Sequence, residues 1–189
     1  MEDWQRHLYD TWFGMYDRTE GGTNLWSSGF EHVFIGEINS KNQVGGFHNW
    51  FHWYYLEQRG DINYLGYWET AEFGENMEVC TVWTREKSIR SYFFKNGGGI
   101  SFTYTWDGHP KPYGSMFLAT SPELEMALYT TCLMVRYILL LLSYSWIMIH
   151  RPEAERHVTL RGRDVYITTW KHTEGGNVMV GSSYPDWKK

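Results

Sequence analysis

Two histidines, His32 and His48, are the residues of this sequence best suited to moving protons, and they flank a segment typical of a β-hairpin. A hairpin brings such positions close together when its register is right. The unperturbed pKa of histidine lies near neutral pH, so one imidazole can accept a proton while the other donates one. The pair therefore suits acid–base catalysis. Because the chain has 8 histidines, two packed structural histidines are the alternative.

A lysine is the next candidate. Lys111 stands between Pro110 and Pro112, within a segment of turn-forming residues at positions 106–115. Prolines and glycines at this density predict a stiff loop. A lysine fixed in such a loop can present a point charge to a phosphate group. A solvated surface lysine is the alternative that this pattern leaves open.

A third pattern concerns zinc. His48 and His52 are four residues apart in a predicted helix, a spacing that can bind the metal. A metalloprotease would carry glutamate directly after the first histidine, and this chain has Asn49 there. The pattern therefore favours a structural His52 over a zinc ligand.

Composition limits the class of protein. The net charge is −5 at pH 7, which excludes a protein that coats nucleic acid through a broad basic surface. The two cysteines, Cys80 and Cys132, do not form a disulfide framework. No signal peptide is visible at the start of the chain. The apolar stretch at 137–149 is shorter than the roughly 20 residues of a membrane-spanning helix, so we expect no membrane partner.

The elements that must position these residues occur in separate blocks of helix and strand. The clearest helix start is at Ser121, a good N-cap, followed by Pro122 at the first helical position. Segregated blocks predict an α+β fold, with antiparallel sheets and packed helices, rather than a parallel sheet. The other predicted helices are 3–16 and 48–58, and the predicted strands are 32–38, 44–47, 100–106, 115–119, 157–160, 165–170 and 178–180.

Several segments, in order along the chain, resemble the signatures of the poly(U)-specific endoribonuclease family (EndoU, also called XendoU). They are SSGFEHVFIGE at 27–37, GFHNW at 46–50, WDGHPKPYGS at 106–115 with ATSPELEMALY at 119–129, and GSSYP at 181–185. The resemblance spans most of the chain. It implies a single EndoU-like catalytic domain over residues 1–189 and an EndoU-like catalytic fold.

The resemblance also implies roles for the three candidates. His48 matches the general base that takes the proton of the ribose 2′-hydroxyl, and His32 matches the general acid that protonates the departing 5′-oxygen. The resemblance leaves open which of the two histidines is the acid and which is the base. Lys111 matches the lysine that stabilises the charged transition state.

Substrate-binding and supporting residues follow in the same way. The resemblance implies that Ser115 and Ser182 help to bind the uridine and that Tyr184 positions the ribose or stacks on the base. Ser182 departs mildly from the family, which often has threonine there. Glu31 and Glu37 match acidic positions that the family needs, either near a metal or as hydrogen-bond partners of the histidines.

The activity implied by the resemblance is cleavage of single-stranded RNA at uridines by attack of the 2′-hydroxyl. The products are 2′,3′-cyclic phosphate and 5′-hydroxyl ends, and the implied cofactor is Mn²⁺ with ligands that the sequence does not name. A monomer and a secreted protein are favoured. The alternative is a catalytically inactive RNA-binding or interaction domain derived from the same fold.

The chain departs from the family pattern in three places. The helical part expected before the first signature is incomplete. The segments 75–95 and 137–149 are atypical insertions that interrupt an otherwise continuous match. We hypothesise that these two segments are retained non-coding sequence or unusual loops, which sequencing of the transcript tests.

Overall fold

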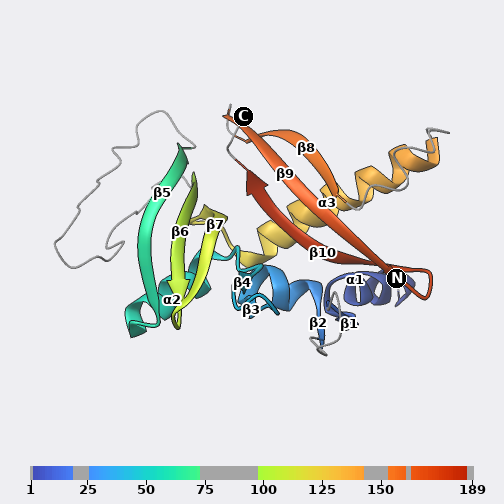
Figure 1. Cartoon of the computed structure of the whole chain (residues 1–189). Helices are drawn as coiled ribbons and strands as arrows, with labels where there is room; N and C mark the ends of the chain where they lie inside the picture. The colour runs from blue at the N-terminus through green and yellow to red at the C-terminus, as the bar shows by residue number, and fades with distance from the viewer. Residues whose placement is uncertain (1, 19–25, 73–97, 143–152, 161–162, 187–189) are drawn as a thin grey trace.

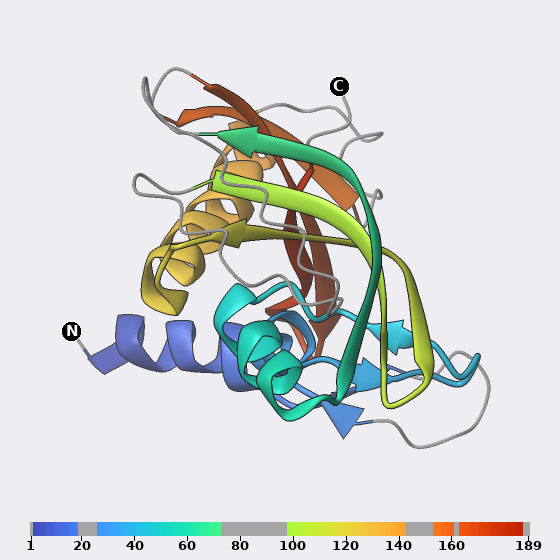
Figure 2. The same cartoon turned by 90° about the vertical axis from the view of Figure 1, so that its left-hand side faces the viewer.

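The molecule consists of two halves, each built on a three-stranded antiparallel sheet (Figure 1). The computed structural model describes residues 2–18, 26–72, 98–142, 153–160 and 163–186. Figure 2 shows that the two sheets face each other across the molecule, with the short N-terminal elements gathered at one end. The α+β fold predicted from the segregated blocks is confirmed.

The first half carries strands β5 (Ile62–Glu72), β6 (Gly98–Trp106) and β7 (His109–Leu118), paired in that order. Helix α2 (Trp50–Arg59) packs against this sheet, and the short strands β3 (Glu37–Ile38) and β4 (Val44–Gly45) pair beside it. The apolar core of this half is rich in aromatic side chains, which include Phe47, Trp53, Phe102 and Tyr104.

The second half carries strands β8 (Glu153–Leu160), β9 (Arg163–Glu174) and β10 (Asn177–Asp186), with β9 in the middle. Helices α1 (Glu2–Phe13) and α3 (Pro122–Leu142) pack against this sheet. The core between them includes Trp12, Phe117, Tyr129, Leu133 and Ile167. Strand β7 supplies Phe117 to this core and also contacts β10, so β7 joins the two halves.

Local sequence explains where helix α2 begins and ends. The side chain of Asn49 accepts a hydrogen bond from the backbone N–H of His52, which caps the first turn. Gly60 ends the helix in the left-handed conformation, at a φ of 83°. The predicted helices at 3–16 and from Ser121 onward are present too, within a few residues of their predicted bounds.

The predicted strand at 32–38 was wrong. Glu31–Ile35 form a π-helix, η1, and only Glu37–Ile38 are extended. Ser28 and Glu31 cap each other reciprocally through side chain and backbone, which starts a helical turn, and Gly36 at φ 84° ends it. This local capping outweighs the strand preference of the β-branched and aromatic residues in the segment.

The predicted loop around Lys111 was also wrong, because His109–Leu118 form strand β7. Pro110 and Pro112 are exposed there. Strand β7 lies at an edge of its sheet, where a residue without a backbone N–H costs no sheet hydrogen bond on the open side. Lys111 itself points to the buried side.

The two atypical segments are only partly placed. Residues 75–95 lie outside the described residues, as do residues 143–149 of the apolar stretch. Its first part, 137–142, continues helix α3. Among the helices of the described residues, none is long and apolar enough to cross a membrane.

Glu125 gives the fold a pH-dependent stability. The side chain is buried in α3 beside Thr120, whose hydroxyl donates to it at 2.5 Å, and burial raises the pKa of its carboxyl to about 8. A raised folded-state pKa means that stability is fully present below the unfolded value near 4.5 and is lost as the pH rises towards 8. Glu125→Gln removes this loss. We expect the variant to melt about 5 °C or more above the unmodified chain at pH 8, but not at pH 4.5, by calorimetry. Equal melting temperatures at pH 8 would show that the carboxyl ionises freely in the folded chain.

Candidate active site

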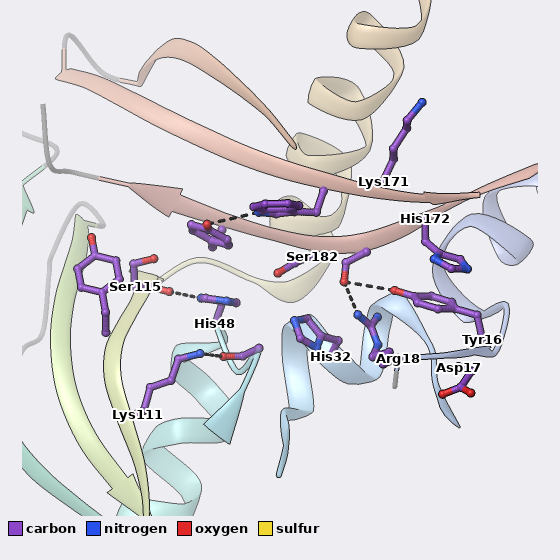
Figure 3. A pocket seen from close by; sticks show the side chains of 15 residues that line it. Tyr16, Asp17, Arg18, His32, His48, Lys111, Ser115, Lys171, His172 and Ser182 are labelled. Carbon is purple, nitrogen blue, oxygen red and sulfur yellow. Dashed lines mark hydrogen bonds between the residues drawn. The ribbon is translucent and has the colours of Figure 1, made fainter. Parts of the chain in front are cut away.

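A pocket of about 590 Å³ lies where the two halves meet (Figure 3). It gathers side chains from β7, β9, β10, η1 and the segment before α2. Six of the eight residues singled out in the sequence line it, and Glu31 and Glu37 do not. The full lining is Tyr16, Asp17, Arg18, His32, Gly46, His48, Lys111, Tyr113, Ser115, Trp170, Lys171, His172, Gly181, Ser182 and Tyr184.

The backbone brings the two histidines together without the predicted hairpin register. The N–H of Phe47 donates to the carbonyl of His32 at 2.8 Å, and the N–H of His48 donates to the carbonyl of Val33 at 2.7 Å. Gly46 allows this close approach. A Cβ atom at Gly46 would lie 1.8 Å from the His32 carbonyl oxygen, and its φ of 57° also favours glycine.

His48 is held on two sides. Its Nδ1 lies 2.7 Å from the Ser115 carbonyl oxygen, and its ring stacks on the Tyr184 ring with centroids 4.7 Å apart. A carbonyl oxygen only accepts, so Nδ1 carries the hydrogen and Nε2 keeps its lone pair. Burial, with the nearby Lys111 charge, lowers the pKa of His48 well below 6.5. His48 is therefore a neutral imidazole at neutral pH, able to accept a proton at Nε2.

His32 has a different partner. Its Nδ1 lies 2.5 Å from an Oε1 oxygen of Glu37, whose other oxygen accepts from the Ser27 hydroxyl at 2.9 Å. Burial lowers the pKa of His32, and the bond to Glu37 opposes this shift. The carboxylate thus favours the protonated ring at His32, whereas His48 faces a neutral carbonyl. The two environments separate the imidazoles into a better proton donor and a better proton acceptor.

Lys111 reaches the same pocket from strand β7. Its Nζ donates to the Gly46 carbonyl at 2.7 Å, and the residue is 8% exposed. Burial lowers the pKa of its amine to about 8, so most of the lysine is charged at neutral pH. The solvated-surface interpretation of this lysine was therefore wrong.

Ser115 and Tyr184 line the end of the pocket next to His48, and Ser182 lies nearer to His32 (Figure 3). The buried Ser115 hydroxyl has no hydrogen-bond partner among the described residues, and the residue lines the pocket. Tyr184 receives a long hydrogen bond of 3.5 Å from the indole of Trp170. Ser182 follows a β-bulge in strand β10, which turns its side chain into the pocket near His32 (Figure 3).

The two glutamates have separate structural functions. Glu37 is a hydrogen-bond partner of the His32 ring, which is one of the two functions predicted for it from the sequence. Glu31 instead accepts a hydrogen bond from the backbone N–H of Ser28 at 2.9 Å. Among the described residues no group of three or more His, Cys, Asp or Glu side chains is placed to hold a metal ion.

Arg18 was not singled out in the sequence. Its guanidinium donates to the Ser27 hydroxyl at 2.6 Å, to the Gly181 carbonyl at 2.6 Å and to the Ser28 carbonyl at 3.1 Å. It also lies 3.9 Å from Glu37. Arg18 thereby ties the partner of His32 to the bulge that carries Ser182. An arginine before a glycine-rich segment gives no local signal of such contacts.

Comparison with known proteins places this chain in a family. The family model "Endoribonuclease XendoU" matches residues 1–138. Uridylate-specific endoribonuclease D of Xenopus laevis is 34% identical over 183 residues, covering 95% of this chain and 48% of the relative. Uridylate-specific endoribonuclease EndoU of Drosophila melanogaster is 30% identical over 185 residues, covering 98% and 46%.

A solved structure agrees with these matches. The structure of XendoU, described as a splicing independent snoRNA processing endoribonuclease, aligns with a TM-score of 0.62 and 30% identity, over 97% of this chain and 55% of that one. The chain spans about half the length of the curated relatives it matches. The matched family model and the shared fold show that this chain belongs to the XendoU endoribonuclease family.

Proposed function

We propose that this chain is an endoribonuclease that cleaves single-stranded RNA at uridines by attack of the ribose 2′-hydroxyl. One observation carries the proposal: a neutral imidazole, a carboxylate-paired imidazole and a buried lysine line a single pocket. Uridylate specificity is named for the relatives. The unpartnered Ser115 hydroxyl and the Tyr184 ring supply a hydrogen-bonding group and an aromatic surface for a base at one end of that pocket.

The reaction assigns each group one proton or charge. Nε2 of His48 takes the proton of the 2′-hydroxyl, and the resulting oxygen nucleophile attacks the adjacent phosphorus. Lys111 stabilises the charge that develops on the phosphate oxygens. His32 gives a proton to the 5′-oxygen as its bond to phosphorus breaks. The products are a 2′,3′-cyclic phosphate and a 5′-hydroxyl end, and hydrolysis of the cyclic phosphate is not required.

A short oligonucleotide with one uridine among deoxynucleotides tests the proposal. We expect a single cut after the uridine, with mass spectrometry detecting the cyclic phosphate on the upstream product. The same substrate with deoxyuridine lacks the nucleophile and should stay intact. Cleavage of the deoxyuridine control would exclude this chemistry. Binding of the oligonucleotide without any cleavage would identify an inactive RNA-binding domain instead.

Manganese dependence stays a prediction from the family resemblance. We expect EDTA to lower the cleavage rate and added Mn²⁺ to restore it. A rate that responds to neither treatment would contradict the prediction. The proton transfers by His48 and His32 and the charge stabilisation by Lys111 use only side chains of the chain itself.

The pH dependence follows from the two imidazoles. The active form needs His48 neutral and His32 protonated, and the pKa of His48 is lowered further than that of His32. The rate kcat/KM should therefore peak between the two values, on the acid side of 6.5. It should fall again near pH 8 as Lys111 loses its charge. Steady-state assays from pH 4 to 9 measure this profile, and a maximum above pH 8 would contradict the assignment.

A further inference from the structure

The pocket continues beyond the residues that the reaction uses. Past His32 and Ser182 it is lined by Tyr16, Arg18 and His172, at the opposite end from Ser115 and His48 (Figure 3). This end is formed by β1 (Tyr16–Asp17), the residue that follows it, and the outer part of β9. The proposed reaction uses none of these residues, and Arg18 makes structural contacts to Ser27, Ser28 and Gly181.

A fixed aromatic surface is the main feature of this end. The rings of Tyr16 and His172 stack with centroids 3.9 Å apart and an interplanar angle of 9°. The Arg18 guanidinium lies over the Tyr16 ring, 4.4 Å from its centroid. Tyr16 is fully buried, and its hydroxyl donates to the Val180 carbonyl at 2.9 Å. Tyr16 is therefore a rigid support, and the His172 side chain, 35% exposed, is the ring that solvent reaches.

Acidic and basic side chains both occur in this part of the pocket, where Asp17, Arg18 and Lys171 line it. Asp17 lines the pocket beside Tyr16, and a Glu174 oxygen lies 3.7 Å from Nε2 of His172. Carboxylates can accept hydrogen bonds from the amino groups of a base. The side chain of Lys171 extends to the other side of β9 from His172 (Figure 3).

The direction of the RNA strand follows from the proposed reaction, on which this inference rests. The uridine lies at the Ser115 end, and His32 faces the departing 5′-oxygen. The nucleotide that carries this oxygen must leave the reaction centre on the His32 side, which is the side of His172. We propose that the His172 ring, supported by Tyr16, is the stacking platform for the base that follows the cleaved uridine.

Paired substrates test the platform. Uridylyl-adenosine presents a downstream base, and the same compound with an abasic downstream ribose does not. Stacking on one aromatic side chain contributes about 1–3 kcal/mol, or roughly 5- to 150-fold. We expect His172→Ala to lower the ratio of kcat/KM values, adenosine over abasic, by about 10-fold. His172→Phe should keep the ratio. His157→Ala, which removes an exposed histidine on β8, should keep it as well.

A binding measurement separates this inference from the proposed function. Deoxyuridine linked to 2-aminopurine cannot be cleaved by the 2′-hydroxyl route, and stacking quenches the fluorescence of its base. The unmodified chain and His172→Phe should quench it, and His172→Ala should not. No quenching by the unmodified chain, or equal quenching by His172→Ala, overturns the platform even if the chain cleaves RNA. Quenching that depends on His172 supports it even if cleavage fails.

Discussion

Replacing His48 with alanine should lower kcat/KM for uridine-containing RNA by about 10²–10⁴-fold, the usual contribution of a positioned acid–base group. The Ser115 carbonyl fixes the ring so that Nε2 has a free lone pair, and burial keeps the ring neutral. Alanine removes the proton acceptor and leaves the 2′-hydroxyl to water. Single-turnover kinetics with saturating protein measure the chemical step directly.

His52→Ala is the matched control for this variant. His52 is four residues away, half-buried, and packs on Phe47 without lining the pocket. Its loss should cost less than a factor of about 5, as expected for a residue outside the chemistry. A thermal melt of each variant checks folding, since His48 is buried. Equal losses in two folded variants would remove His48 from the role of base.

Lys111→Met should lower kcat by about 10²–10³-fold, the range for removing one stabiliser of transition-state charge. Methionine keeps much of the length of the lysine stem and removes the ammonium group. The charge acts mainly on the transition state, so kcat should change much more than KM. Lys41→Met, in the exposed turn after β3, removes a charge of the same type from a residue that does not line the pocket, and it should leave kcat unchanged.

Two outcomes would count against this role for Lys111. A rise in KM with no change in kcat would make the lysine a ground-state binding group. An undiminished rate near pH 9, where an amine with a pKa of about 8 is largely neutral, would show that its charge is not needed. Folding is again checked by a thermal melt, because the lysine donates to the buried Gly46 carbonyl.

Local signals in the sequence predicted most of the helices. Ser121 with Pro122, and Gly60 after 48–58, are start and stop residues that act over one helical turn, and both helices are present. The prediction of a strand at 32–38 was wrong because reciprocal hydrogen bonds between Ser28 and Glu31, which precede the strand-like residues, start a helical turn. The prediction of a loop around Lys111 was wrong because the prolines of this strand are tolerated only at the edge of a sheet, and the edge position depends on the whole sheet.

Part of the candidate site could likewise be predicted from the sequence, and part could not. The types of His32, His48 and Lys111 suggested their chemistry, and the family motifs located them. Their different environments were not predictable in full. The family motifs offered Glu37 as a hydrogen-bond partner of a histidine, but the Ser115 carbonyl meets His48 only when strand β7 packs beside the segment before α2. Arg18 and His172 gave no signal, since their contacts to β10 and Tyr16 join residues more than 150 positions apart.

The central claim is that a proton acceptor, a proton donor and a fixed ammonium group surround one phosphodiester. A crystal structure with a dinucleotide that carries 2′-fluorouridine, which binds but cannot attack, tests it most directly. We expect the uridine against Ser115 and Tyr184, the 2′-fluorine facing Nε2 of His48, and the phosphate within hydrogen-bonding distance of His32 and Lys111. A phosphate bound elsewhere, with these side chains directed away from it, would contradict the account.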